Sequence, residues 1–416
     1  MKRKLFLLLM TLPIFIASCE NDDDLSSAKN ERKYIVLTRS QKELANENVK
    51  FAFSLFNKVN EQETEQPNWI MSPLSASIAM SIISNGTGGD SQVQIQNALG
   101  FNGFQMDEIN DYYKLLTKEL LAVDNTSKLS LANSIWLHND YKFHDTFAKT
   151  VRKMYDAEVS ALDLTDQSAL NKINDWSAEH TNNLIPVILD KLPENLKFCI
   201  LNSLYFKGVW LDEFEESSTV VDFFTCANGR KNQVKMMKQE TSQRYCSNEY
   251  FALAEFPYGN GAFSMVVLLP NEDCTLEESL QKFTVNDWIG TTESASLKMF
   301  MSDLNVSFPR FELKYEADFI KVMQNLGVVD IFDENKADFT NLSSNNVFIN
   351  LLKQSAYLKV DEKGAEAAAT TIVGGMDASP GPSYRIIDFN MNRPFAFLIK
   401  ENSTGAILFM GKVTEL

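Results

Sequence analysis

The sequence is poor in histidine, and no motif for hydrolytic or phosphate chemistry stands in it. Its three histidines all lie in the first half of the chain, and none is near a serine in a G-x-S-x-G context. A catalytic triad also needs an acid and an oxyanion site, which no motif here suggests. The run Gly86-Thr87-Gly88-Gly89 lacks the Lys and Ser/Thr of a phosphate loop. We therefore expect a protein that is not an enzyme and that needs no cofactor.

Cysteine is also scarce. Five cysteines are scattered along the chain without any C-x-x-C pair, so the sequence predicts no metal site and no redox motif. Cys226 and Cys246 could form a disulfide in an oxidising compartment or remain two separate thiols. Both alternatives stay open because sequence alone does not place the two backbones.

Basic residues are outnumbered by acidic ones, 39 to 55, which gives a formal net charge of −16. This balance argues against nucleic acid as a partner, because phosphate binding needs clustered Lys and Arg. After about residue 38 the chain also lacks linkers rich in Pro, Gly or Ser, internal repeats, and any apolar run long enough to cross a bilayer. We therefore expect residues 39–416 to form a single large domain.

The amino terminus has the form of an export signal. Basic residues are followed by an apolar run and then by Ala17-Ser18-Cys19, which resembles the lipobox of bacterial lipoproteins. Residues 1–18 are thus expected to be a lipoprotein signal peptide, Cys19 the lipidated residue, and residues 19–38 a flexible tether. The alternative is an ordinary signal peptide cut near a free cysteine. The acidic run after Cys19 is either a solvated spacer or a signal for surface export in the outer membrane.

Hydrophobic periodicity predicts helices early in the body and strands late. Ser40–Glu43 has the form of a capping box, and Ser72-Pro73 is typical of a helix start. The mixture favours an α+β fold with largely antiparallel sheets. The expected helices are 41–60, 72–86, 90–99, 145–154 and 170–184, and the expected strand regions are 198–206, 262–270 and 394–413.

Six ordered segments resemble the serpin family, whose members include single-use protease inhibitors, and the resemblance runs from about residue 40 to the end. It implies a serpin fold of three β-sheets with eight or nine helices and an exposed reactive-centre loop at about 362–392. The segments are Asn68–Ser75, Asn202–Trp210, Phe256–Tyr258 with Ser264-Met265, Phe308–Phe311, Arg393–Phe395 and Phe409–Val413.

The resemblance also implies particular site residues. Those assigned to the shutter and breach, the regions that control opening of the main sheet, are Ser72, Ser75, Asn202, Trp210 and Gln354. Gln354 stands where many serpins have a histidine, so that site keeps a hydrogen-bonding side chain but loses one that titrates near pH 6 to 7.

The hinge of the reactive loop combines a glycine with small side chains. In an extended strand Ala365, Ala367 and Ala369 share one face, whereas Glu366 lies on the other. That small, uncharged face could enter a sheet without burying an unpaired charge, and Gly364 supplies backbone freedom. The alternative is a flexible Ala/Thr-rich loop in which this alternation of side chains is accidental and has no functional role. The hinge residues are Glu362, Gly364, Ala365, Glu366, Ala367, Ala368, Ala369 and Thr370.

Family spacing places the scissile bond at Ala378-Ser379, with Val373-Gly374 and Met376-Asp377 as alternatives because the following segment is a little long. Small residues there favour an elastase-like serine protease, and subtilisin- or papain-like enzymes are further candidates. The resemblance thus implies a monomeric suicide inhibitor, tethered by its lipid to the bacterial envelope. The alternative is a non-inhibitory serpin that serves as a binding or carrier lipoprotein.

Overall fold

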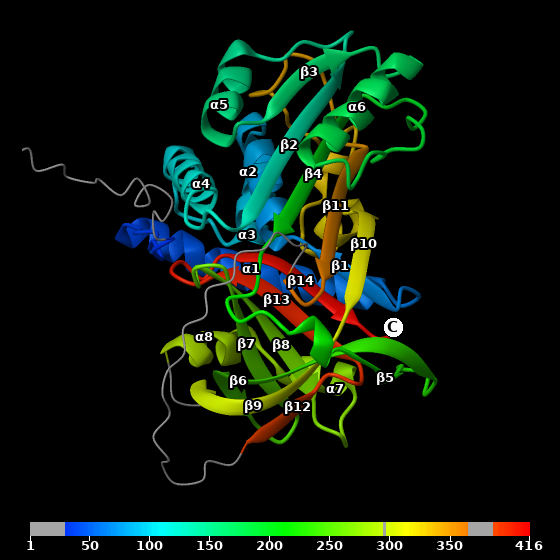
Figure 1. Cartoon of the computed structure of the whole chain (residues 1–416). Helices are drawn as coiled ribbons and strands as arrows, with labels where there is room; N and C mark the ends of the chain where they lie inside the picture. The colour runs from blue at the N-terminus through cyan, green and yellow to red at the C-terminus, as the bar shows by residue number, and fades with distance from the viewer. Residues whose placement is uncertain (1–29, 294–296, 365–385) are drawn as a thin grey trace, which may run out of the picture.

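The computed structural model describes residues 30–293, 297–364 and 386–416. These residues contain nine α-helices, six of them before residue 181, and fourteen strands, most of them later in the chain (Figure 1). The predicted α+β class is confirmed. The helices are α1 (Arg39–Gln62), α2 (Pro73–Gly86), α3 (Gly89–Leu99), α4 (Met106–Leu120), α5 (Asp145–Tyr155), α6 (Gln167–His180), α7 (Leu276–Lys282), α8 (Val285–Glu293) and α9 (Ile320–Asn325).

The strands form two hydrogen-bonded networks in the described part of the chain. One sheet has five strands in the order β10-β11-β4-β2-β3, and the other has nine. The strands are β1 (Asn68–Met71), β2 (Lys128–His138), β3 (Glu158–Leu162), β4 (Phe198–Lys207), β5 (Val220–Thr225), β6 (Lys231–Ser247), β7 (Phe251–Tyr258), β8 (Phe263–Pro270), β9 (Phe300–Pro309), β10 (Phe311–Asp318), β11 (Leu351–Val360), β12 (Ile387–Asn390), β13 (Phe395–Glu401) and β14 (Ile407–Val413).

The nine-stranded network combines what the sequence led us to expect as two separate sheets. Its order is β1-β14-β13-β8-β7-β6-β9-β12, with β5 beside the start of β6. The 17-residue β6 joins the two parts, because its start pairs with β5, its middle with β9 and its last four residues with β7. The second and third sheets are therefore continuous through one long strand.

Two helix starts illustrate how local sequence sets the elements. Ser72 caps α2, accepting a hydrogen bond from the backbone N–H of Ser75 at 3.1 Å, as predicted. The capping box of α1, in contrast, lies two residues earlier than expected: Thr38 and Gln41 exchange the capping bonds. Glu43 instead pairs with Arg39 on the helix surface at 3.2 Å.

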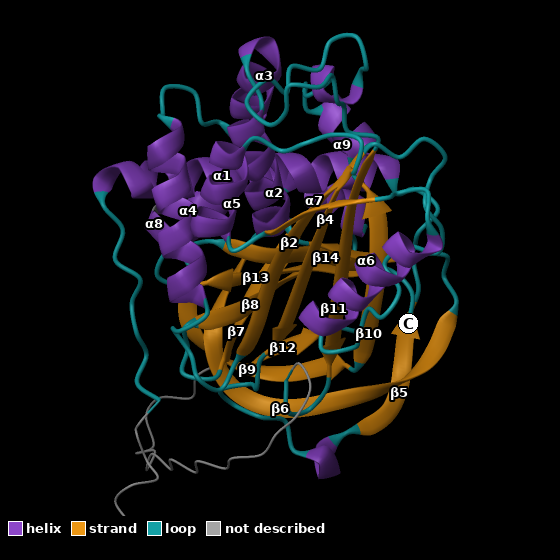
Figure 2. Ribbon diagram, turned by 90° about the horizontal axis from the view of Figure 1, so that it is seen from above, coloured by secondary structure: helices purple, strands orange, loops and turns teal. Residues whose placement is uncertain are grey.

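The five-stranded sheet is covered on both faces. Alternate residues of β4 point in opposite directions, so that Cys199 and Leu201 pack with α6 whereas Ile200 and Leu204 enter the main core. Figure 2 shows α6 apart from the group formed by α1, α2, α4 and α5. Strand β4 is therefore buried along nine of its ten residues, as its continuous apolar pattern indicates.

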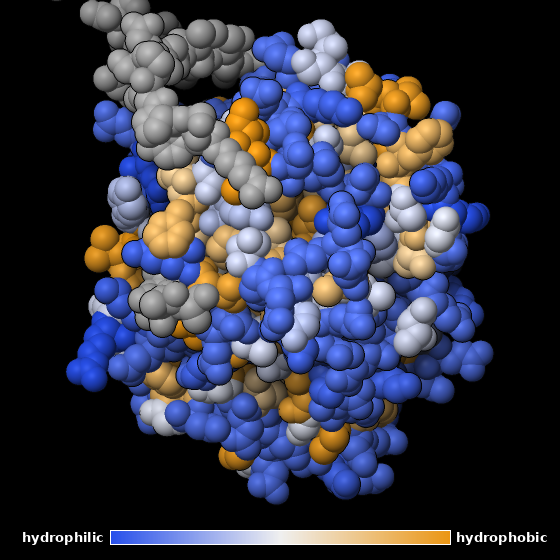
Figure 3. Space-filling model, turned by 90° about the horizontal axis from the view of Figure 1, so that it is seen from below, coloured by the Kyte–Doolittle hydropathy of each residue, from blue (hydrophilic) through white to orange (hydrophobic). Residues whose placement is uncertain are grey.

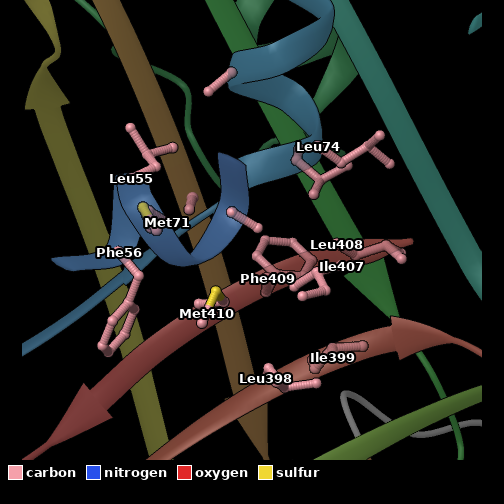
Figure 4. Packing of buried hydrophobic residues seen from close by; sticks show 14 of the residues in the cluster. Leu55, Phe56, Met71, Leu74, Leu398, Ile399, Ile407, Leu408, Phe409 and Met410 are labelled. Carbon is pink, nitrogen blue, oxygen red and sulfur yellow. The ribbon is translucent and has the colours of Figure 1, made fainter. Parts of the chain in front are cut away.

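The main core lies between α1, α2 and the carboxyl-terminal hairpin. Leu55 and Phe56 of α1 and Leu74 of α2 lie over Leu398 of β13 and Met410 of β14, and all five are buried (Figure 4). Burying one such side chain contributes about 1.5–3 kcal/mol. The last strands of the chain thus hold its first helices in place.

Residues 30–38 belong to the body rather than to the expected tether. Asn30 donates a hydrogen bond to Asp124 at 2.8 Å, and the backbone N–H of Ile35 donates to Ser403 at 2.9 Å. Ile35 and Leu37 are buried. The expected tether is correspondingly shortened at its carboxyl end. Across the described ranges, no helix combines the length and the apolar character that spanning a membrane requires.

Candidate functional site

The centre of the five-stranded sheet is a seam between two parallel strands, β11 and β4. They pair in register from Leu351 opposite Cys199 to Tyr357 opposite Tyr205, and β10 and β2 flank them antiparallel. The pairing stops at Tyr357, although β11 continues to Val360. A strand that turned back from the end of β11 into this seam would run antiparallel to both neighbours, which is the more stable arrangement.

The Gln354 side chain connects this seam to the start of helix α2. Its side-chain oxygen accepts the backbone N–H of Ser72 at 2.8 Å, and its NH₂ group donates to the Ser72 carbonyl at 2.9 Å. Gln354 also faces Asn202, its register partner on β4, whose amide donates to the Ser75 carbonyl at 3.3 Å and to Asn133 at 2.6 Å. One polar network therefore joins α2, β2, β4 and β11.

Replacing Gln354 by leucine should destabilise this network. The buried N–H of Ser72 would lose the bond that Gln354 provides, whereas the Ser72 carbonyl would keep its bond from Ala76. One orphaned buried donor costs about 1–3 kcal/mol. We expect a thermal midpoint roughly 1–4 °C lower by circular dichroism. The exposed Gln324→Leu on α9 is the control, and equal midpoints for the two variants would contradict this role.

Trp210 contacts the chain where it leaves the sheet after β11. Its ring stacks on Tyr258 at 4.3 Å between centroids, and its indole N–H donates to the Asp361 carbonyl at 3.0 Å. Its backbone N–H donates to the Lys363 carbonyl at 2.8 Å. The chain after β11 is thus pinned against the segment after β4.

Gly364 is the last described residue before the loop, and its site admits no side chain. Its φ of 127° lies in the region that favours glycine, and it forms an isolated bridge with Val209. An added Cβ would lie 2.2 Å from the carbonyl oxygen of Gly208. The glycine that the sequence pattern marked as a hinge therefore makes a close backbone contact at the end of β4.

Glu362 anchors the same turn through charge. Its side chain is buried, and it accepts hydrogen bonds from Thr219 and from Arg310, whose Nε lies 2.7 Å from the carboxylate. Burial raises the pKa of Glu362, but the bonds from Arg310 and Thr219 more than offset it and hold the pKa below its usual value. The Glu362 carbonyl also accepts the backbone N–H of Phe214 at 2.9 Å.

The structure places the shutter and breach residues named from the sequence, but not the rest of the loop. Residues 365–385 lie outside the described residues, and so do the proposed bond and its alternatives. The hinge residues concerned are Ala365, Glu366, Ala367, Ala368, Ala369 and Thr370, and the bond residues are Val373, Gly374, Met376, Asp377, Ala378 and Ser379. The chain returns at Ile386, and β12 then pairs in parallel with β9.

Sequence reasoning missed the partners of these residues. Arg310 was noted only as part of a motif, and Thr219 and Asn133 were not singled out, yet all three complete the polar contacts. Arg310 and Glu362 stand 52 residues apart. The only available signal was that a charged residue in a strand-rich, apolar motif needs a partner.

The remaining sequence predictions concern cysteine and metal. Cys226 and Cys246 are both free thiols, so the possible disulfide is not formed. Within the described ranges, no group of three or more His, Cys, Asp or Glu side chains is arranged to hold a metal ion. Cys19, the expected lipidation site, lies outside the described residues.

Comparison with known proteins identifies the fold. Residues 46–416 match the family described as Serpin (serine protease inhibitor). The chain belongs to the serpin family. The leukocyte elastase inhibitor of Xenopus laevis is 30% identical to it over 380 residues, which cover 88% of this serpin and 97% of that relative.

Solved serpin structures agree with the architecture. The native state of the thermophilic serpin Tengpin superposes with a TM-score of 0.82 at 27% identity, covering 93% of this chain and 97% of Tengpin. Human thyroxine-binding globulin, solved in complex with thyroxine, superposes with a TM-score of 0.80 at 25% identity, covering 90% and 99% of the two chains. The serpin fold expected from the six sequence segments is therefore confirmed.

Proposed function

We propose that this serpin is a single-use inhibitor of serine proteases, with an elastase-like enzyme as its target. The main support is the parallel pairing of β11 and β4, which consists of only seven residue pairs. The expected hinge at Glu362–Gly364 follows β11 directly and is held against the segment after β4. The small side chains after Gly364 fit such a seam, and relatives 30% identical are named leukocyte elastase inhibitors. Papain- and subtilisin-like enzymes are further targets by the same logic.

The proposed reaction begins as ordinary proteolysis. The protease nucleophile attacks the carbonyl carbon of Ala378, and the Ala378-Ser379 bond breaks as the new amine of Ser379 takes up a proton. The product is an ester between protease and serpin, or a thioester with a cysteine protease. The freed segment then enters the seam as a sixth strand, a mode of peptide addition for which serpins are a known example.

Insertion would displace the captured protease over a protein-sized distance. Fourteen residues separate Gly364 from the proposed bond. At about 3.3 Å per residue they span roughly 45 Å. Two sets of contacts would control when this strand enters. The hydrogen bonds of Gln354 hold the seam itself, and the contacts of Trp210 with Lys363 hold the end of the seam at which the new strand would enter.

The decisive experiment mixes the purified protein with pancreatic or neutrophil elastase and analyses the products on a denaturing gel. We expect a detergent-stable complex and a released peptide beginning at Ser379 by mass spectrometry. Elastase whose active serine is blocked beforehand is the matched control, and it should give neither product. Clean cleavage without a complex by elastase, subtilisin and papain alike would contradict the inhibitor proposal.

That contrary outcome would favour a carrier instead. The likeness to thyroxine-binding globulin supports this second candidate, together with an apolar cavity between α1, α7 and the strands of the main core. Phe53, Phe283 and Leu398 are among its lining residues. The cavity measures about 30 Å³, which is room for a water molecule or two, so a carrier would have to open it considerably.

We further propose that the mature protein starts at a lipidated Cys19 and works at the bacterial envelope. The docked Asn30 lies eleven residues further on. At about 3.5 Å per residue, such a tether would hold the body within roughly 40 Å of the lipid surface. The mass of the amino-terminal peptide from membrane-extracted protein is the test, and a peptide without acyl chains would overturn the anchor.

A further inference from the structure

The outward face of β6, β9 and β12 carries an exposed apolar group at the foot of the reactive loop. Along β9 the residues Leu304, Val306 and Phe308 point into the core, so Met301 and Asp303 point outward. Met301 is 65% exposed and Ile386 50%, whereas the neighbouring Phe300, 62% exposed, lies on the opposite side of β9 by the same alternation. Large apolar side chains exposed together in this way mark interaction surfaces more often than scattered single ones do.

The strand register brings Ile386 to the same surface. Ile387 pairs with Leu304 and Asp388 with Asn305, so Ile386 stands beside Asp303 at the open end of the β9–β12 ladder. Alternation places Ile386 and Asp388 on the outward side, together with Asp303. Met301 lies two residues further along that face. The apolar group therefore comprises residues from two neighbouring strands.

The same face carries carboxylates without basic partners. Glu240, Asp303 and Asp388 are all exposed, and no ion pair to any of them is found among the described residues. Ser242 donates to Asp303, and Asn305 donates to Asp388 at 2.8 Å, which orients both carboxylates but leaves their charge.

The two cations on this side of β6 are already engaged. Arg244 lies 3.5 Å from the buried Glu255, and Lys238 lies 3.3 Å from Asp222. Glu255 also pairs with Lys400 at 3.2 Å, and Arg244, the register partner of Met301, is 43% exposed, so the Met301 end of the face keeps a cation. The face is therefore apolar at Met301 and Ile386 and negative around Ile386, which complements a surface that is apolar and cationic.

The position of this face indicates what would occupy it. Ile386 directly follows residues 365–385, and β12 holds the returning chain against β9 by parallel pairing. Any protease that took the loop as substrate would be brought towards this end of the molecule. Figure 3, viewed from the side on which β9 and β12 lie in Figure 1, shows hydrophobic surface interspersed among hydrophilic residues there.

We propose that this loop-foot face, formed by Glu240, Met301, Asp303, Ile386 and Asp388, is a docking surface for a cationic target protease. The proposal rests on the proposed protease-inhibitor function and adds the charge of the partner to it. Docking there would raise the association rate before any covalent step, because opposite charges steer encounter and an apolar centre holds the encounter complex. Later steps would be unaffected.

The test compares wild-type protein with Asp303→Asn/Asp388→Asn and with Met301→Lys. The rate of loop cleavage or complex formation, kcat/KM or kon, is measured against two elastases whose net charges differ. For the more cationic enzyme at low ionic strength we expect the rate to fall roughly 3- to 10-fold for each variant. The effect of the two carboxylates should largely disappear at about 0.5 M salt. Asp111→Asn, an exposed carboxylate on α4, is the matched control and should leave the rate unchanged.

The outcomes separate this proposal from the one on which it rests. If wild-type protein is cut at a normal rate but forms no complex, the inhibitor proposal fails and the cleavage rate still tests the docking face. If complexes form and both variants react at the wild-type rate with the cationic enzyme, the docking face is wrong. A decrease that is equal for both elastases, or that persists in high salt for the double variant, would also overturn the charge argument. A chain that no elastase cleaves overturns both.

Discussion

Replacing Ala365 by arginine is expected to convert the proposed inhibitor into a protease substrate. The residue follows Gly364, and alternation places it on the face that would be buried when the segment enters the seam between β11 and β4. An arginine there would bury an unpaired charge, which costs several kcal/mol. Since each 1.4 kcal/mol changes a rate tenfold, insertion should slow by more than tenfold, and the protease should complete hydrolysis and escape.

The neighbouring position supplies a matched control for this prediction. Glu366→Arg places the same side chain one residue further on, where alternation directs it away from the buried face. We expect that variant to keep most of its yield of detergent-stable complex with elastase, whereas Ala365→Arg should yield mainly cleaved serpin. Equal complex yields for Ala365→Arg and wild type would refute insertion of this segment as a strand. Thermal scans of both uncleaved variants check that each is folded.

Local sequence signals predicted much of the fold. The Ser72-Pro73 start of α2 and the apolar pattern of β4 gave elements whose positions the structure reproduces within one or two residues. Helix α4 was not predicted, although Ile109, Tyr113 and Leu116 recur at helical spacing. The capping box of α1 was placed two residues late because Thr38-x-x-Gln41 and Ser40-x-x-Glu43 fit one rule equally well.

The candidate site could be predicted only in part, because its contacts join distant segments. Gln354 was expected to form a hydrogen bond, but its pairing with both backbone groups of Ser72 depends on how α2 meets a strand 282 residues later. Similarly, the pattern marked Gly364 as flexible, whereas the structure shows a close approach to Gly208. Which residues pair across strands, and which backbones touch, depends on how distant segments pack together. Composition and periodicity describe only local segments, so they do not predict these contacts.

The second large effect is expected at the pinned start of the loop. Glu362→Gln removes the charge that faces Arg310 beneath the hinge, while the glutamine keeps the shape. Breaking a buried pair costs about 3–5 kcal/mol, and because the Arg310 side chain is one-third exposed we expect about 2–3 kcal/mol here. The uncleaved variant should therefore unfold at a lower temperature, or insert its loop without cleavage and lose inhibitory activity on storage at 37 °C.

The stability contributed by the Glu362 carboxylate should depend on pH in a defined direction. The folded-state pKa of Glu362 is lower than the ordinary 4.5, so its stabilising contribution is complete above about pH 4.5 and is lost as the pH falls further, through the folded-state pKa. The difference in thermal midpoint between wild type and Glu362→Gln should thus be constant from pH 8 to about 5 and shrink below it. The exposed pair Lys197–Glu334, tested by Glu334→Gln, should contribute at most about 1 kcal/mol throughout. If Glu362→Gln behaved like that surface variant at pH 7, the ion pair would not be what holds the loop's first residues to the body.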